Sequence, residues 1–540
     1  MAPTLLSSTD VRPRLRKSRR LSFRRLAAWV MASATNRDGA SAFVFGFATI
    51  HALLWTVILI NLKAAQDVHM DVAEAFAWGQ KFQLGYGKHP PLAGWIAGIW
   101  FDMFPVADWA TYLLATTTLA IGLVISWLIA VRVVDYRRAF FILVMLAIYP
   151  IFNFKGFKYN PDLLQLVTLP LLVLAYLHAF EKRSALSGLW LGLAAALALM
   201  TKYWVLTMIG AVGIAALLHP DRLKFLRSPA PWVATAAAVV AMIPHLLWLK
   251  DVDFVPLTYA GDVYGNRTRI ESALLVLGYV EHNLGLLALP VLLAGVAIAG
   301  TGLLRWPSAT LARIWSRGAN AGVKLTQALN VWIIQIVVAV GPPLGGLFFS
   351  VYMKTDWGIS LFFLTPLALV AMPALRLPGA AVFRMTAIWL VLTLATLAAS
   401  PTIALHEVTE SPSAAFSYGA RSQLARELTG MWHNRFFSRW PVVAGTTEIG
   451  EPMTFYSPDH PAPLTPGEIW SSGLTSLEEA KHLGFIGICD TTDNRLPECE
   501  AWMAENAKDA EQLAMTTQRF FKGHPGPAIT WKVYIEPPAK

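Results

Sequence analysis

Long apolar runs with almost no charged residue recur between residues 43 and 404 of this 540-residue chain. A helix of about 18 or more such residues is long enough to cross roughly 30 Å of hydrocarbon. Only 14% of all residues are charged and 55% are hydrophobic, a composition that water-soluble domains rarely show. We therefore expect an all-α multi-pass membrane domain, with about eleven transmembrane helices near residues 43–62, 110–131, 139–153, 163–180, 186–200, 205–218, 230–248, 274–303, 328–350, 359–374 and 385–404.

Basic segments alternate with mixed segments along the chain. The stretch VRPRLRKSRRLSFRR (residues 11–25) is too basic, and its apolar run begins too late, for a cleaved signal peptide. Residues 1–42 are therefore predicted to be a cytoplasmic tail, with a nucleic-acid-binding arm as the alternative. With this end inside, the cytoplasmic loops are mainly basic and the opposite loops mix acids with bases. Topology and contact with anionic membrane lipids thus explain the net charge of +10 without a nucleic-acid partner.

An odd number of spans sends residues 405–540 to the outer face, where the composition becomes that of a soluble domain. The pattern predicts a small periplasmic α/β domain, with strands at 440–446, 484–489 and 529–537 and an amphipathic helix over 499–521. The chain thus divides into a tail (1–42), a membrane domain (43–404) with a long outer loop at 63–109, and a C-terminal domain (405–540).

Cys489 and Cys499 are the two cysteines of the chain, and both belong to the C-terminal domain. In an oxidising compartment they are expected to form a disulfide, with two unpaired buried thiols as the alternative. Because there is no CxxC motif, a structural zinc site is not expected.

The first outer loop contains DVAEAFAWGQKFQLGYGKHPP (residues 71–91), an unusual gathering of charge. Helical spacing puts four residues, in this stretch or just before it, on one stripe of a helix: Asp67, Asp71, Glu74 and Trp78. We expect an amphipathic helix at the membrane surface that presents its carboxylates together, and a solvated acidic face without function is the alternative. The glycines and prolines that follow allow a tight return, which should hold Lys88 and His89 near the same carboxylates.

This loop resembles that of the GT-C type glycosyltransferases that use polyprenyl-phosphate sugars. The D-x-x-E helix, the Gly-rich return and HPPL are similar to the first outer loop of the dolichyl-phosphate-mannose-protein mannosyltransferase-like group. That group includes the lipid A aminoarabinose transferases and the rhizobial galacturonosyltransferases. KYNPDLLQL (residues 158–166) is similar to its second outer loop, and ALMTKYW (residues 198–204) to a lysine turn between two short spans. The resemblance covers roughly residues 40–405 in architecture and excludes the C-terminal domain.

The resemblance implies a transferase in which an acceptor hydroxyl attacks the anomeric carbon of a sugar carried on a polyprenyl phosphate, with inversion. Such a reaction needs a carboxylate to accept the proton and cations to stabilise the departing phosphate. The family's proposed base corresponds to Asp71. Two positions depart from the family: Val72 stands where many relatives have Glu, so the second acid is Glu74, and Lys88 stands where the aminoarabinose branch carries an acid. The division of roles between Asp71 and Glu74 stays open.

Four other residues are candidates for substrate binding. Lys202 is the first candidate for the lipid phosphate, because it lies at the outer end of a short span, although a lysine that only snorkels to the interface is the alternative. Lys354 and Arg267 are further candidates. Asp162 either orients a substrate or caps its own helix.

No metal site and no required cofactor are predicted. His89 is expected to pack at the site and not to bind a metal ion, because the Asp, Glu and His residues lack diagnostic spacing. A divalent metal ion stays an open alternative, since parts of this superfamily depend on one.

We therefore predict a glycosyltransferase of the bacterial inner membrane. Its partners would be a polyprenyl-phosphate-linked hexose or pentose and an envelope acceptor, which is lipid A, lipopolysaccharide or another glycolipid. A protein O-mannosyltransferase is the alternative within the same class. A transporter or flippase for lipid-linked sugars would share the many spans, but such proteins place ionisable residues at mid-membrane and show repeated halves.

Overall fold

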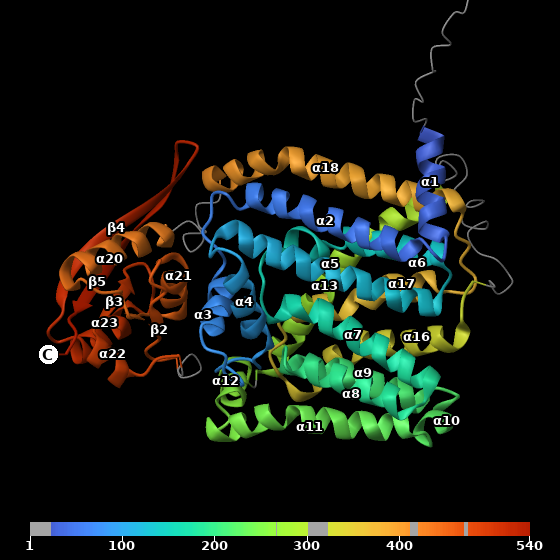
Figure 1. Ribbon diagram of the computed structural model, residues 1–540, viewed down its shortest axis with the longest axis horizontal. Coiled ribbons are helices and arrows are strands. Elements are labelled where there is room, and N and C mark those ends of the chain that lie inside the picture. Colours follow the sequence, from blue (N-terminus) through green and yellow to red (C-terminus); the bar gives the residue numbers. More distant parts are fainter. Residues whose placement is uncertain (1–22, 266, 301–321, 411–419, 469–473, 540) are drawn as a thin grey trace, which may run out of the picture.

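The computed structural model describes residues 23–265, 267–300, 322–410, 420–468 and 474–539. Its larger part is a bundle of helices that run side by side, and a smaller domain that contains a sheet lies at one end of the bundle (Figure 1). The expected fold class, an all-α membrane domain followed by an α/β domain, is confirmed.

Within the described ranges, seven helices are long and apolar enough to cross a membrane. They are α2 (Ala40–Leu62), α5 (Asp108–Val133), α7 (Pro161–Lys182), α11 (Pro229–Asp251), α13 (Arg269–Ala299), α16 (Leu325–Phe349) and α18 (Gly379–Glu410). An eighth span is formed if α6 (Tyr136–Ile148) is joined with the 3-10 turns η1 (Pro150–Phe152) and η2 (Phe154–Phe157), across a bend of 79°.

The other three expected spans are also helical but shorter. They correspond to α8 (Ala185–Leu199), to η3 (Tyr203–Val205) with α9 (Leu206–Leu218), and to η4 (Thr355–Leu364) with α17 (Thr365–Val370). Every expected span is thus helical in the described structure, but only seven or eight of them meet the length for a full crossing.

Different elements lie at the two ends of the bundle. At one end lie α1 (Phe23–Thr35) and the basic helix α10 (Arg222–Leu226), as Figure 1 shows. Arg132, near the end of α5, forms an ion pair with Glu181, near the end of α7, at 3.1 Å. At the opposite end lie α3 (Met70–Gly79), α4 (Leu92–Met103), α12 (Val255–Tyr264) and the C-terminal domain. Most of the basic tail and the basic loop at 301–321 lie outside the described residues.

The C-terminal domain contains a five-stranded sheet of order β2-β1-β3-β5-β4. Its strands are β1 (Val442–Ala444), β2 (Ala462–Leu464), β3 (Phe485–Asp490), β4 (Glu511–Phe521) and β5 (His524–Glu536). β1 pairs in parallel with β2 and β3, whereas β5 pairs antiparallel with β3 and β4. Four helices accompany the sheet: α20 (Arg421–Phe436), α21 (Thr447–Tyr456), α22 (Leu477–Leu483) and α23 (Leu496–Asn506).

The three expected strands are confirmed, but the long helix expected over 499–521 is wrong in its second half. The helix α23 ends at Asn506, and residues 511–521 form β4, which pairs with β5 over nearly its whole length. Pairing with a neighbouring strand overrides a helical pattern that only the local sequence supplied. A disulfide joins Cys489 of β3 to Cys499 of α23, with Cα atoms 5.9 Å apart.

Candidate active site

Helix α3 is enclosed between the bundle and the C-terminal domain. All its residues from Val72 to Gly79 are buried, so the helix does not have the solvent-exposed face that the amphipathic pattern predicted. Asp67 precedes the helix and accepts a hydrogen bond from Ser422 Oγ of the C-terminal domain, at 2.8 Å. The predicted acidic stripe is therefore not a solvated face of one helix, because Asp67 lies before α3 and contacts the second domain.

Close backbone contact holds α3 against α4. A Cβ atom at Gly79 would lie 2.5 Å from the backbone nitrogen of Gly98, so only glycine fits at this crossing. The return between the two helices is fixed by Tyr86, whose hydroxyl donates to the Trp78 carbonyl at 2.8 Å and whose ring stacks on Trp78 at 5.0 Å. These contacts fix the direction in which α3 presents its carboxylates.

Asp71 faces the start of α7. Lys158 Nζ lies 3.2 Å from Asp71 Oδ2, and Asn160 Nδ2 donates to the same oxygen at 2.7 Å. Burial by itself would raise the pKa of Asp71, but the ammonium of Lys158, then His69 and the hydrogen bond from Asn160, hold this pKa well below its usual value. Asp71 is therefore an ionised carboxylate at neutral pH.

Asn160 connects Asp71 to helix α7. Its Oδ1 accepts a hydrogen bond from the backbone N–H of Leu163 at 2.9 Å, which makes Asn160 the N-cap of α7. The capping role considered for Asp162 therefore belongs to Asn160. Asp162 instead accepts a hydrogen bond from Lys202 Nζ at 2.6 Å, and Lys202 is only 8% exposed.

A cavity of about 160 Å³ is lined in part by Lys158 and Asn160, the two residues that contact Asp71. Its charged and polar lining residues are Lys155, Lys158, Asn160, Asp162, Lys354, Asp356 and Ser360. Lys155 forms an ion pair with Asp356, with Nζ 3.6 Å from Oδ1. Three lysines in so small a space favour an anion, and Lys158 belongs both to the cavity and to the surroundings of Asp71.

Glu74 lies one turn beyond Asp71 but has a different partner. Lys88 Nζ donates to Glu74 Oε1 at 2.5 Å. Burial raises the pKa of Glu74 above its usual value, although Lys88 offsets part of the effect. His89 packs against the edge of Trp78, and burial, then the charges of Lys202 and Lys88, lower its pKa well below the usual value. His89 is thus neutral at physiological pH.

The structure brings most of the predicted site residues to one end of the bundle. They do not form one cluster, because each has different contacts. Lys354 and Asp162 line the cavity, and Lys202 lies behind Asp162 and over the Trp357 ring at 5.6 Å. Arg267 is exposed, with its guanidinium 5.6 Å from the Tyr352 ring centre, and it does not line the cavity.

Four residues of the site were not predicted from the sequence: Lys155, Lys158, Asn160 and Asp356. Lys158 and Asn160 belong to KYNPDLLQL, so the motif itself contained the signal, although only its aspartate was selected. Asp356 likewise belongs to YMKTDWG, a segment of which only Lys354 was selected. Among the residues that the structure describes, no group of three or more His, Cys, Asp and Glu side chains is arranged to hold a metal ion.

The chain is similar to known proteins both in sequence and in structure. Residues 88–248 match a family described as dolichyl-phosphate-mannose-protein mannosyltransferase. The structure of ArnT from Cupriavidus metallidurans bound to undecaprenyl phosphate superposes with a TM-score of 0.55 at 12% identity, over 91% of this chain and 98% of that chain. The membrane domain has the GT-C fold. The resemblance found in the sequence is thereby confirmed. The expectation that it excludes the C-terminal domain is wrong, because a match over 91% of this chain must include much of residues 405–540.

Two curated relatives from Rhizobium johnstonii are similar to part of the chain. The lipid A galacturonosyltransferase RgtD is 27% identical over 216 residues, which are 39% of this chain and 44% of RgtD. The lipopolysaccharide core galacturonosyltransferase RgtB is 25% identical over 213 residues, which are 38% of this chain and 43% of RgtB. The similarity therefore spans less than half the length of either relative.

Proposed function

We propose that this protein is a membrane glycosyltransferase that moves a sugar from a polyprenyl-phosphate donor to an envelope glycolipid. The observation that carries the proposal is the shared position of Lys158, which contacts the ionised Asp71 and also lines a cavity with Lys155 and Lys354. A carboxylate beside a cluster of cations suits a reaction that removes a proton from a hydroxyl and releases a phosphate.

The reaction that we propose is an inverting displacement. The acceptor hydroxyl oxygen forms a bond to the anomeric carbon, its proton passes to Asp71, and the bond from that carbon to the phosphate oxygen breaks. The departing phosphate keeps the electron pair of that bond, and the ammonium groups of Lys158 and Lys354 stabilise its charge. Asp162, held by Lys202 at 2.6 Å, lines the same cavity and would orient the sugar or the acceptor.

Lys158 would also link donor binding to the strength of the base. A carboxylate with a strongly lowered pKa is a weak proton acceptor, because acid–base catalysis favours a pKa near the operating pH. A phosphate in the cavity would share the charge of Lys158 with Asp71, and the pKa of Asp71 would then rise. The base would become stronger only when the donor is present.

The donor and acceptor classes rest on the relatives and on apolar space near the site. ArnT binds undecaprenyl phosphate, and RgtD and RgtB act on lipid A and on the lipopolysaccharide core. An apolar cavity of about 550 Å³, lined by Trp204, Tyr352 and Trp357 among others, would accept a lipid chain, and Trp357 also contacts Lys202. We propose lipid A or lipopolysaccharide as the acceptor.

We also propose that the site faces the outside of the inner membrane. The basic helix α10 lies at the end of the bundle opposite α3 and the C-terminal domain (Figure 1). Basic loops remain in the cytoplasm during insertion, so the opposite end would be periplasmic.

Mass spectrometry of envelope lipids tests the proposed function. Lipid A and core oligosaccharide from a strain that lacks this protein should lose the mass of one sugar, and the wild-type gene on a plasmid should restore it. Unchanged envelope lipids in the deletion strain would contradict a glycolipid acceptor.

A further inference from the structure

A groove of about 610 Å³ lies on the surface of the helical bundle, along helices α7 and α8. Three apolar side chains of α8 that line it are exposed: Trp190, Leu193 and Leu197 are 58%, 40% and 37% exposed. Exposed apolar surface on a bundle of membrane-spanning helices faces lipid chains. The groove therefore suits a lipid and not a water-soluble ligand.

The length of the groove matches one acyl chain. Trp190 and Met200 both line it, and between them α8 and its C-cap rise by about 15 Å, which is half of the roughly 30 Å of hydrocarbon in a bilayer. Helix α8 is fixed against α11, because a Cβ atom at Gly192 would lie 2.3 Å from the carbonyl oxygen of Ala234. The groove is thus a preformed space for a chain from a single leaflet.

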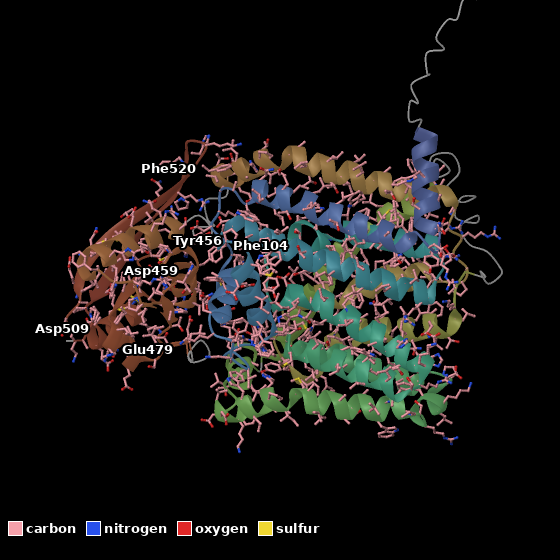
Figure 2. All side chains as sticks on the ribbon, viewed as in Figure 1. Phe104, Tyr456, Asp459, Glu479, Asp509 and Phe520 are labelled. Atoms are coloured by element: carbon pink, nitrogen blue, oxygen red, sulfur yellow. A yellow bond between two sulfur atoms is a disulfide. The ribbon has the colours of Figure 1, made fainter. Side chains whose placement is uncertain are left out.

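The polar end of the groove lies far from the candidate active site. It is lined by Arg132, in the last turn of α5, and by His178, near the end of α7. From Asp162, which lines the lysine-rich cavity, to His178, α7 rises by about 24 Å. Figure 2 labels Phe104 and Tyr456 at the end of the bundle where α3 meets the C-terminal domain. A phosphate held in the lysine-rich cavity therefore cannot also contact Arg132.

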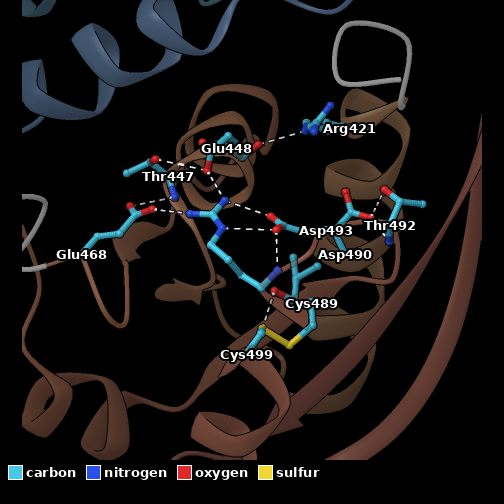
Figure 3. A network of polar contacts seen from close by, with 11 residues as sticks. Arg421, Thr447, Glu448, Glu468, Cys489, Asp490, Thr492, Asp493 and Cys499 are labelled. Carbon is cyan, nitrogen blue, oxygen red and sulfur yellow. Dashed lines mark hydrogen bonds and ion pairs between the residues drawn. A yellow bond between two sulfur atoms is a disulfide. The ribbon is translucent and has the colours of Figure 1, made fainter. Parts of the chain in front are cut away.

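Arg132 retains hydrogen-bond donors for a further anion. Its one ion pair among the described residues is with Glu181, and both side chains are partly exposed. Arg495 of the C-terminal domain differs, because three carboxylates that Figure 3 labels surround its guanidinium: Glu448, Glu468 and Asp493. A guanidinium has five N–H donors in a planar fork that suits a phosphate. The donors of Arg132 that Glu181 does not use can therefore bind a phosphate at the polar end of the groove.

We propose that the groove binds an anionic phospholipid of the leaflet on the α10 side of the bundle. The phosphate lies at Arg132 and His178, and one acyl chain runs along α8 to Met200. The basic helix α10 at the same end of the bundle also favours an anionic headgroup. Since Met200 comes just before Lys202, the chain ends beneath the turn that carries this lysine. This inference goes beyond the proposed sugar transfer and does not depend on it.

Native mass spectrometry of delipidated full-length protein, titrated with phosphatidylglycerol, tests the proposal. Arg132→Gln should raise the dissociation constant of the first bound lipid by about fivefold, which is the effect of one cation at a headgroup. Arg435→Gln is the matched control, because Arg435 also pairs with a glutamate, Glu511 at 2.6 Å, but belongs to the C-terminal domain. Equal dissociation constants for Arg132→Gln and the wild type would overturn the proposal.

A variant that fills the groove provides a second test and leaves Arg132 in place. A lipid that binds the folded protein raises its melting temperature, so added phosphatidylglycerol should do so in the wild type. Leu193→Trp puts a bulky side chain where the acyl chain lies, and this rise should be lost. Leu189→Trp is the control, because Leu189 is 39% exposed on the same helix but does not line the groove. A rise in Leu193→Trp equal to that of the wild type would contradict the proposal.

Competition between lipids identifies the kind of lipid that the groove binds. Phosphatidylcholine, which has the same chains but no net charge, should bind more weakly than phosphatidylglycerol. An equal concentration of a polyprenyl phosphate should not displace phosphatidylglycerol from the site that depends on Arg132. Equal affinity for phosphatidylcholine, or displacement by the polyprenyl phosphate, would show that the groove is not a site for an anionic phospholipid. Because no sugar transfer is measured, failure of the proposed function would leave these results unchanged.

Discussion

Lys158 is the residue on which the charge of the site depends. Its ammonium lies 3.2 Å from Asp71 Oδ2 and holds the pKa of that carboxyl well below its usual value. Lys158→Met should raise the pKa of Asp71, and the acid limb of the pH profile of kcat/KM should move to higher pH, because Asp71 must be ionised to accept a proton.

Lys155→Met is the control for this shift. Lys155 lines the same cavity but pairs with Asp356 at 3.6 Å, so its loss should weaken donor binding without moving the acid limb. An unchanged acid limb in Lys158→Met would mean that Lys158 does not set the charge of the base.

At the residue scale the sequence predicted which side chains gather but not how they pair. Asp71 and Glu74 were expected to act together, because helical spacing puts them on one face. In the structure Asp71 contacts Lys158 and Asn160, whereas Glu74 contacts Lys88. Such pairing depends on where other segments cross α3, and helical periodicity holds no information on those crossings.

The close crossing of α3 and α4 is the element that fixes the first outer loop. Gly79→Ala would place a Cβ atom 2.5 Å from the Gly98 backbone nitrogen. Alanine usually stabilises a helix relative to glycine, but here the overlap should lower the free energy of unfolding by about 1–3 kcal/mol. The measurement is a thermal melt of purified protein in detergent.

Gly46→Ala in α2 is the matched control, because a Cβ atom at Gly46 meets nothing within 4 Å. This control should melt at or above the wild-type temperature. A wild-type melting temperature for Gly79→Ala would show that the two helices can separate without cost.

At the element scale the long apolar helices were predictable, since each carries its own signal in length and composition. The strand β4 was not, because residues 511–521 continue a helical pattern and form a strand only by pairing with β5. The burial of α3 was missed for the same reason. The sequence pattern predicted that one side of α3 faces solvent. In the structure α21, which lies nearly 400 residues later in the chain, packs against α3.

For the whole molecule, the central expectation is that the C-terminal domain lies outside the cytoplasm. Alkaline phosphatase fused after residue 540 should be active, because it folds only in an oxidising compartment. Alkylation of the denatured, unreduced protein should leave Cys489 and Cys499 unlabelled, in keeping with the disulfide between them. An inactive fusion together with two freely labelled thiols would contradict this orientation.

The general architecture could be predicted from the sequence because it depends on hydrophobicity and on the alternation of charge along the chain. The packing of the C-terminal domain against α3 could not, since Phe455 belongs to no motif of the membrane domain and meets Phe76 only in the folded protein.

The most direct test of the account is sugar transfer by purified wild type, Asp71→Asn and Glu74→Gln, with a polyprenyl-phosphate donor and matched amounts of protein. Asp71→Asn keeps the size of the side chain but removes its capacity to accept a proton, so transfer should fall by roughly 10²-fold or more. Glu74→Gln should lose less, because Glu74 pairs with Lys88, whereas Asp71 contacts Lys158 and Asn160, which line the cavity. Transfer by Asp71→Asn at the wild-type rate would contradict the account.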